Sequence, residues 1–238
     1  MDQIQLILAN WTFFAGGLLR TLQLAAVTLV FATLIAALVG LASVARTKAL
    51  RVAALVYVEF FRDIPLLVNV FFVYFAAPVV GIRLDPFTAS CVSLSVWGGA
   101  YGAEIVRGGF NAVPHHQDLS ATALGMKRWE ILWFVIIPQM ILPILPAFTG
   151  LFVLLIQSTS VAAIIGDLEL LRSGQIAIER ATLMTGQSPA FAVYGCILVL
   201  YFIVCWCLTR FAKWLELKLV GRTQRSAAPI RNPAEGSV

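Results

Sequence analysis

Side chains that could take part in chemistry are scarce in this sequence and occur in short groups. One group is four consecutive polar residues at the end of a long apolar stretch: Gln157, Ser158, Thr159 and Ser160. Four adjacent polar side chains cannot all be satisfied by one neighbouring helix, and polar groups at membrane depth usually face a pathway or another helix. The group therefore favours a polar pathway. Asn69, a lone amide in another apolar stretch, fits a pore or an interhelical hydrogen bond equally well.

Two acid–base pairs have helical spacing. Glu59 and Arg62, and separately Glu104 and Arg107, are three residues apart, which places each pair on one face of a helix. These four residues are expected to form structural ion pairs or to anchor a gate, rather than to bind a substrate.

Signatures of enzymes and metal sites are missing from the sequence. It contains no HExxH or GxSxG motif, no paired acids, and no GxxxxGK[ST] phosphate-binding loop. His115 and His116 have no third ligand-like neighbour, so no metal site is expected. The four cysteines lie in apolar segments, where cysteine behaves as a small hydrophobic residue.

The composition is that of a membrane protein. Of 238 residues, 60% are hydrophobic and 12% are charged, and the mean hydropathy is +0.90. Soluble domains are roughly 45–50% apolar and about 25% charged. The sequence therefore predicts an all-α polytopic membrane protein, with one transmembrane domain over residues 1–221 and a polar, disordered cytoplasmic tail over residues 222–238.

Five transmembrane helices are expected, because each span needs about 20 mostly apolar residues. We place them at about 18–44, 65–80, 87–107, 131–156 and 190–211. Of the 17 Lys and Arg residues, one set of connecting segments holds only Arg20, Arg83, Arg172 and Arg180. Because basic residues are retained on the cytoplasmic side, the N-terminus is expected outside and the C-terminus inside.

Two spans carry residues that affect helix packing. Gly98 and Gly102 have the GxxxG spacing that permits close approach of helices, either within one subunit or between two. Pro138, Pro143 and Pro146 interrupt the backbone ladder of the fourth span and are expected to give kinks or hinges.

A stretch with signals for helix starts and stops connects the third and fourth spans: HHQDLSATALGMKRWEILWFVIIP. Pro114 stops the preceding helix, and Asp118 is expected to cap a new one of two turns. Gly125 suits a left-handed stop. The resulting short helix would rest on lipid headgroups or would dock on a partner, with Leu119, Ala123, Leu124 and Met126 available.

This stretch resembles the EAA loop of ATP-binding-cassette importer permeases. Ala123, Leu124 and Gly125 match the middle of that pattern, and Ile137, Pro138 and Gln139 match its end. YVEFFRDIPLLVNVFFVYFAAP, GAYGAEIVRGGFNAVP and LLIQSTSVAAIIGDLELLR are similar to further signatures of the polar amino-acid branch, which includes histidine, glutamate, glutamine and arginine permeases. The resemblance covers about residues 17–219.

The sequence departs from the family pattern at four positions. Leu119 stands where the family has its loop glutamate, and His116 stands where it usually has glycine. Gln157 and Ser158 replace a lysine and an acidic or amide residue. These departures affect the expected glutamate contact with an ATPase and any inference from charge, but not the docking role.

The resemblance implies the MetI-like fold of type I importers and a set of partners. Such permeases form homo- or heterodimers in the inner membrane, bind cytosolic ATPase subunits and receive substrate from an external binding protein. ATP and Mg²⁺ belong to the ATPase. By the same resemblance, Asp118, Leu119, Ala123, Leu124 and Gly125 form the knob that docks on the ATPase, and Lys127 and Arg128 pair with nearby acidic or phospholipid groups.

Two other classes of membrane protein are alternatives to an importer subunit. A secondary transporter or channel would need no ATPase, but it should show more intramembrane ionisable residues or an internal repeat. A membrane enzyme has no motif to support it. For an importer, the lack of an obvious mid-membrane carboxylate disfavours cationic amino acids and points to glutamate, aspartate or glutamine.

Overall fold

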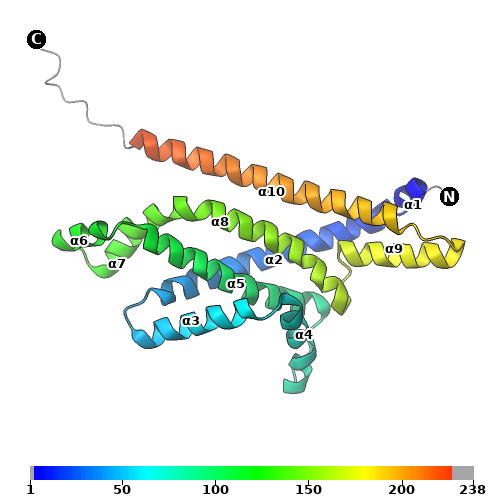
Figure 1. Ribbon diagram of the computed structural model, residues 1–238, viewed down its shortest axis with the longest axis horizontal. Helices are drawn as coiled ribbons and strands as arrows, with labels where there is room; N and C mark the ends of the chain where they lie inside the picture. The colour runs from blue at the N-terminus through cyan, green and yellow to red at the C-terminus, as the bar shows by residue number, and fades with distance from the viewer. Residues whose placement is uncertain (1–2, 227–238) are drawn as a thin grey trace, which may run out of the picture.

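The computed structural model describes residues 3–226, and every regular element in that range is a helix (Figure 1). In chain order the α-helices are α1 (Gln3–Ala9), α2 (Trp11–Ser43), α3 (Lys48–Asp63), α4 (Leu66–Ala76), α5 (Pro86–Ala112), α6 (His115–Ala123), α7 (Arg128–Glu130), α8 (Ile137–Ser158), α9 (Leu170–Thr185) and α10 (Ala190–Ser226). Two 3₁₀ segments, η1 (Ala77–Val80) and η3 (Thr159–Ile165), and one π-helical segment, η2 (Ile131–Ile136), complete the set. Helices α6 and α7 lie at one end of the molecule, the α6 end, and α1 and α9 lie at the other, the α9 end.

Helices α2 and α5 form the most extensive contact of the bundle. Small residues allow their backbones to approach. A Cβ atom on Gly102 would lie 2.5 Å from the Cβ atom of Ala36, and one on Gly98 would lie 2.7 Å from a methyl group of Leu155 in α8. Both glycines of the GxxxG pair therefore pack within this chain, which is one of the two roles that the sequence allowed.

A sharp bend separates α3 from α4. Ile64 is extended, as expected for the residue before a proline, and Pro65 is the N-cap of α4. The two helices meet at 102°. The region predicted as the second span, residues 65–80, therefore consists of α4 and η1, which project from the bundle (Figure 1).

The predicted fourth span is helical throughout but changes its geometry. Residues 131–156 comprise the π-helical segment η2 and most of α8, with α7 directly before them and η3 after the end of α8. The π-helical segment lies directly before Pro138, which has no amide hydrogen for an α-helical bond. Pro143 and Pro146 lie inside α8.

Three helices are long and apolar enough to cross a membrane: Trp11–Ser43, Arg128–Ile165 and Ala190–Leu219. The bent pair of α3 and α4 with η1 is a fourth candidate if it counts as one span. Helix α5 has 27 residues, but many of its buried positions are serines, glycines and alanines, beside a few large apolar residues such as Leu94 and Trp97. A helix enclosed by its neighbours needs little apolar surface for lipid.

The observed boundaries differ from the predicted ones at both ends of the chain. Helix α2 begins at Trp11 rather than near residue 18, because the apolar pattern continues on both sides of Gly16 and Gly17. Helix α10 continues to Ser226, into the region predicted as a disordered tail from residue 222. The rest of that tail lies outside the described residues.

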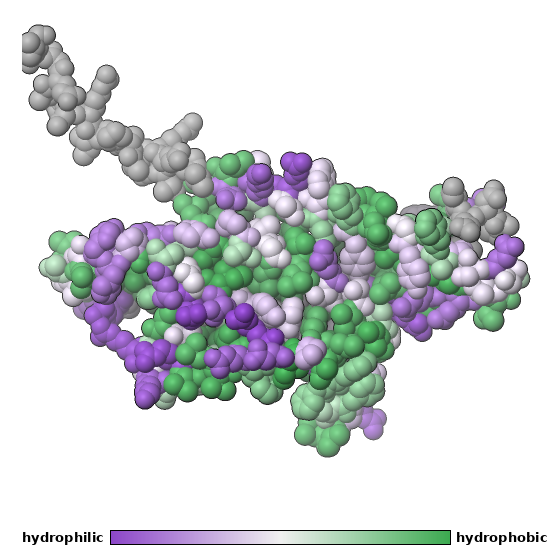
Figure 2. Space-filling view, in the orientation of Figure 1, coloured by the Kyte–Doolittle hydropathy of each residue, from purple (hydrophilic) through white to green (hydrophobic). Residues whose placement is uncertain are grey.

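The surface in Figure 2 is divided by hydropathy. Hydrophobic residues cover the middle of the bundle and the projecting α4, whereas hydrophilic residues gather at the α6 end and in a band over α3. Apolar side chains on α4 and η1 include Phe72, Phe75 and Val79, all strongly exposed.

Candidate functional site

The short helix α6 has the stop that the sequence predicts but not the start. Gly125 has φ +77°, and the amide of Met126 donates to the carbonyl of Ala121 at 3.2 Å, as in a glycine-terminated helix. The expected N-cap at Asp118 is wrong: α6 starts at His115, with Pro114 as the N-cap residue. Pro114 is extended and needs no amide partner, so the helix can begin directly after it.

Asp118 instead fixes α6 to the next helix. Arg128 Nη1 donates to both carboxylate oxygens of Asp118, each at 3.1 Å. One turn further along the same face of α6, Ala121 is buried against Ile131 and Met140. A helix this short is not stable alone, so these contacts with the start of the fourth span hold it in place.

The outward side of α6 and its C-terminus present apolar side chains to the surrounding medium. Leu124 is 82% exposed and Leu119 is 56% exposed, and Ala123 and Lys127 are also exposed. Met126, which the sequence offered for docking, is half-buried and packs against the same core as Ala121.

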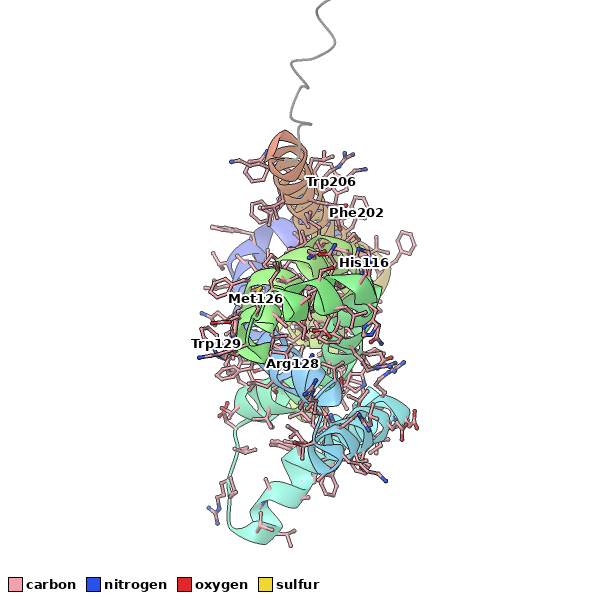
Figure 3. The ribbon with its side chains drawn as sticks, turned by 90° about the vertical axis from the view of Figure 1, so that its left-hand side faces the viewer. His116, Met126, Arg128, Trp129, Phe202 and Trp206 are labelled. Atoms are coloured by element: carbon pink, nitrogen blue, oxygen red, sulfur yellow. The ribbon has the colours of Figure 1, made fainter. Side chains whose placement is uncertain are left out.

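Figure 3 looks onto the α6 end and shows what surrounds this surface. His116, Met126, Arg128 and Trp129 all lie on the end face, on or beside α6 and α7. An exposed apolar patch on a helix held by both an ion pair and core contacts can bind a partner and transmit its movement to the fourth span.

The four polar residues at the end of α8 point in different directions. Gln157 is exposed, whereas Thr159 is fully buried and donates to the carbonyl of Ile156 at 2.7 Å. Ser160 donates to the backbone carbonyl of Gln157 at 2.8 Å, and Ser158 is half-buried. Of this group, Gln157 has the most accessible side chain.

Asn69 is buried, and its Nδ2 donates to the carbonyl of Ser93 in α5 at 3.1 Å. The structure thus gives Asn69 the interhelical hydrogen bond that was one of its two expected roles. Tyr57 makes a similar connection, since its hydroxyl donates to the carbonyl of Val96 at 2.8 Å.

The two acid–base pairs behave differently. Arg107 donates to both carboxylate oxygens of Glu104, with its Nε 3.0 Å from Oε2. Glu59 and Arg62 form no ion pair in the described part of the chain. The guanidinium of Arg62 lies over the ring of Tyr101 instead, 5.2 Å from its centroid.

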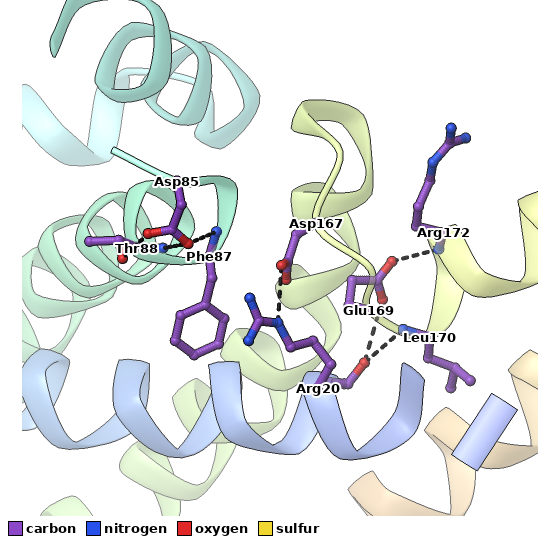
Figure 4. Close-up of polar contacts among 9 residues, drawn as sticks. Arg20, Asp85, Phe87, Thr88, Asp167, Glu169, Leu170 and Arg172 are labelled. Carbon is purple, nitrogen blue, oxygen red and sulfur yellow. Dashed lines mark hydrogen bonds and ion pairs between the residues drawn. The ribbon is translucent and has the colours of Figure 1, made fainter. Parts of the chain in front are cut away.

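The structure also contains a charged cluster at the α9 end that the sequence did not reveal (Figure 4). Arg20 Nε donates to Asp167 Oδ1 at 3.1 Å, and the guanidinium lies over the ring of Phe87, 4.0 Å from its centroid. Nearby, Asp85 caps α5 by accepting from the amides of Phe87 and Thr88. Arg20 thereby joins α2, the start of α5 and the segment before α9.

The acids of this cluster differ in their pKa. Burial raises the pKa of Asp167 and outweighs the opposing effect of Arg20, because Asp167 Oδ2 is buried without a partner in residues 3–226. The hydrogen bond from the Thr88 side chain lowers the pKa of the exposed Asp85. As pH rises, the contribution of Asp167 to the stability of the fold therefore decreases, whereas that of Asp85 increases.

Glu169 is fully buried beside this cluster and caps α9. Its Oε1 accepts from the amide of Arg172 at 2.8 Å, and its Oε2 accepts from the amide of Leu171 and from the hydroxyl of Tyr201, each at 2.9 Å. Thr21 in α2 accepts from the amide of Leu170 at 3.1 Å. Burial raises the pKa of Glu169, although these donors oppose the effect.

Sequence reasoning treated Arg20 only as a charge that reports topology. A charged residue within a long apolar stretch needs a partner, and the acids at Asp167 and Glu169 were the available candidates. That signal identifies the need for a pair, but the partner is 147 residues away in the chain and follows only from the fold.

Long apolar helices, a fourth span interrupted by prolines and a short exposed helix held at one end are features of a polytopic helical membrane protein with a docking surface. The pattern of the family described as "Binding-protein-dependent transport system inner membrane component" matches residues 29–219.

Relatives and solved structures agree with that match. The chain is 34% identical to the glutamine transport system permease protein GlnP of Escherichia coli K12 over 70% of this chain and 74% of the relative. It is 30% identical to the L-cystine transport system permease protein TcyB of Bacillus subtilis 168 over 88% and 87%. A crystal structure of an amino acid ABC transporter superposes with a TM-score of 0.81 and 28% identity, covering 92% of this chain and 99% of that one. The MetNI methionine transporter, 20% identical with a TM-score of 0.73 over 88% and 97%, shows the same fold.

The chain belongs to the family of binding-protein-dependent transport system inner membrane components. It is a multi-pass inner-membrane permease subunit of an ABC importer with the MetI-like fold, and it is a transport subunit rather than an enzyme. ATP is hydrolysed by a separate subunit in such importers. The family assignment also decides against the secondary transporter or channel and against the membrane enzyme.

Proposed function

We propose that this chain forms the translocation pathway of an ATP-driven importer of polar amino acids and couples that pathway to a cytosolic ATPase through α6. The observation that carries the proposal is the exposed apolar surface at Leu119 and Leu124, on a helix fixed to the fourth span by Asp118 and Arg128. Force applied to that surface would reach α8 through the ion pair and the core contacts.

The proposed membrane arrangement has five spans, with the N-terminus outside and the C-terminus inside. It is supported by the distribution of basic residues and by α5, whose length exceeds that of a span. The start of α3, the α6–α7 region and the far end of α10, all rich in basic residues, lie at the same end in Figure 1. That end would be cytoplasmic, and the α9 end would face outward.

Three kinds of partner follow from this arrangement. The ATPase, which would bind ATP and Mg²⁺, docks on the knob formed by Asp118, Leu119, Ala123, Leu124 and Gly125. A second permease subunit, identical or related, completes the pathway. An external binding protein delivers the substrate at the α9 end.

Glutamine is the favoured substrate. The Escherichia coli relative is named for glutamine transport and the Bacillus subtilis relative for L-cystine, so a polar α-amino acid is common to both names. Gln157, the accessible member of the polar group on α8, offers an uncharged amide to a passing polar side chain. Of glutamine, glutamate and aspartate, the relatives favour glutamine.

Co-purification and uptake test the proposal together. The chain is expressed with candidate cytosolic ATPases and washed in mild detergent, and the retained complex is reconstituted with a binding protein and a panel of labelled amino acids. We expect one ATPase to be retained and glutamine uptake to depend on ATP. Failure to retain any ATPase, or ATP-independent uptake, would contradict the proposal.

A further inference from the structure

A cavity of about 340 Å³ lies between α8 and the adjoining parts of α3 and α5. One wall carries Arg62, Tyr101 and Glu104, and the other carries Ala147, Gly150 and Leu154. The volume is within the range of about 300–1,000 Å³ that is typical of small-molecule sites. Charged and aromatic groups thus face small apolar residues across a space that could hold an amino acid.

The cavity contains one guanidinium, that of Arg62, which lies within the field of Glu104 but is in ion-pair contact with no described carboxylate. Arg107 neutralises Glu104 through two hydrogen bonds. Arg62 has no ion pair with any described residue, and its contact with the ring of Tyr101 orients the guanidinium without neutralising it. The guanidinium is therefore free to bind an anion.

The wall of the cavity that carries Arg62 and Glu104 is too polar to face lipid. Ionised groups within membrane-spanning segments almost always face a water-filled cavity or another protein surface. Hydrophilic residues form a band over α3 on this face of the molecule, whereas the projecting α4 is apolar (Figure 2). The cavity therefore belongs to the pathway side rather than to the lipid side.

On the opposite wall, Gly150 has no side chain that would fill the cavity. A Cβ atom at Gly150 would meet no other atom within 4 Å, so no packing contact inside this chain requires glycine there. Gly109 differs, because its added Cβ would lie 2.2 Å from a methyl group of Ile144. Open space at Gly150 is the space of the cavity itself.

We propose that this cavity binds the head group shared by all α-amino acids, on the cytoplasmic side of the pathway. Arg62 binds the α-carboxylate, because a guanidinium fork matches the two oxygens of a carboxylate. Glu104 accepts from the α-ammonium, since an ionised carboxylate has about four acceptor positions and Arg107 occupies two of them. The site is indifferent to the substrate side chain, so selectivity arises elsewhere.

This inference rests on the proposed function, and its test separates the two. The complete importer is reconstituted with its ATPase and binding protein, and uptake of labelled L-glutamine is measured for Arg62→Gln, Arg62→Lys and Arg51→Gln. Arg51 is the matched control, because it is an exposed arginine on the same helix and does not line the cavity. ATP hydrolysis stimulated by the binding protein is measured in parallel.

We expect Arg62→Gln to lower glutamine uptake about tenfold, as for the loss of one charge-assisted contact. Arg62→Lys should keep part of the activity, and Arg51→Gln should match the wild type. Stimulated ATP hydrolysis should persist in Arg62→Gln. Uptake in Arg62→Gln equal to that in Arg51→Gln would overturn the site. Joint loss of uptake and stimulated hydrolysis would also overturn it, because it would assign Arg62 to gating.

A binding measurement on the wild type tests the site without any substitution. Labelled L-glutamine is equilibrated with the purified complex lacking the binding protein, and competition is measured with L-glutamine and with its α-carboxamide. We expect only L-glutamine to compete, because the carboxamide lacks the anion that Arg62 binds. Equal competition would overturn the head-group site while leaving importer function intact. A wild-type importer that takes up no amino acid would instead overturn the proposed function.

Discussion

The Nη1 group of Arg128 donates hydrogen bonds to both carboxylate oxygens of Asp118, at 3.1 Å each. The pair spans Gly125, the glycine that ends α6 before the fourth span begins. The two residues are ten positions apart and belong to different helices. Together with the core contacts of Ala121 and Met126, this pair restrains the connection at Gly125. It makes α6 and the start of the fourth span one mechanical unit.

A double-mutant cycle measures how strongly Asp118 and Arg128 are coupled. Asp118→Arg and Arg128→Asp should each lower the uptake rate, and the exchange of both residues should recover part of it. Because the pair is partly exposed, we expect a coupling free energy of about 0.2–1 kcal/mol. The rates are measured in reconstituted importer at low and high salt. Strictly additive effects of the two single changes would show that the ion pair is not used.

Packing between α2 and α5 gives a second prediction. Gly102→Ala should lower the free energy of unfolding by about 1–3 kcal/mol, because the added Cβ would lie 2.5 Å from that of Ala36. Thermal stability in detergent is the measurement. Gly108→Ala on the same helix is the control, since its added Cβ meets no atom within 4 Å.

The same pair of variants separates packing within the subunit from packing between subunits. If Gly102 belongs only to a dimer seam, Gly102→Ala should dissociate the dimer while the subunit keeps its melting temperature. We expect the reverse order, in which the subunit loses stability first. Size-exclusion chromatography at each temperature distinguishes the two outcomes.

The charged cluster at the α9 end predicts that pH changes the stabilising contributions of two acids in opposite directions. The raised pKa of Asp167 means that its protonated form favours the folded state, so its stabilising contribution is lost as pH rises through the folded-state pKa. The lowered pKa of Asp85 means that its contribution is present above the unfolded-state pKa and is lost as pH falls through the folded-state value.

Melting temperatures of Asp167→Asn and Asp85→Asn, each compared with the wild type between about pH 4 and pH 8, check these signs. As pH rises, the wild type should lose stability relative to Asp167→Asn and gain it relative to Asp85→Asn. Glu169 titrates in all three proteins, and its effect cancels in the difference for Asp85→Asn; in Asp167→Asn the loss of the Asp167 charge also removes one cause of the raised pKa of Glu169. Parallel pH profiles for the two variants would contradict the assignment of burial as the dominant cause at Asp167.

Local signals in the sequence were sufficient for several features of the fold. Proline at positions 65 and 114 and glycine at 125 act through their own backbone geometry, so the bend before α4, the end of α5 and the stop of α6 could be predicted. The start of α6 was predicted wrongly. Asp118 suits the first turn of a helix as well as its N-cap, and the helix begins directly after Pro114, which places Asp118 in the first turn.

Features that depend on distant segments were harder to predict. Arg20 and Asp167 meet only because α2 lies against α9, and Arg62 is directed to Tyr101 rather than to Glu59 by the packing of α3 on α5. Sequence spacing specifies which residues share a helical face, but not which neighbouring helix that face meets. The cavity beside Arg62 is a property of three helices and leaves no local signal.

The most direct test of the account is ATP-dependent uptake by an importer that carries Leu124→Glu. Leu124 is 82% exposed, so a charged side chain should leave the fold intact while preventing the apolar contact with the ATPase. Leu183→Glu, at an 88% exposed leucine of α9, is the matched control at the opposite end. We predict that Leu124→Glu is present at normal amounts in the membrane but loses uptake and retention of the ATPase, whereas Leu183→Glu keeps both. Wild-type uptake by Leu124→Glu would contradict the coupling role of α6.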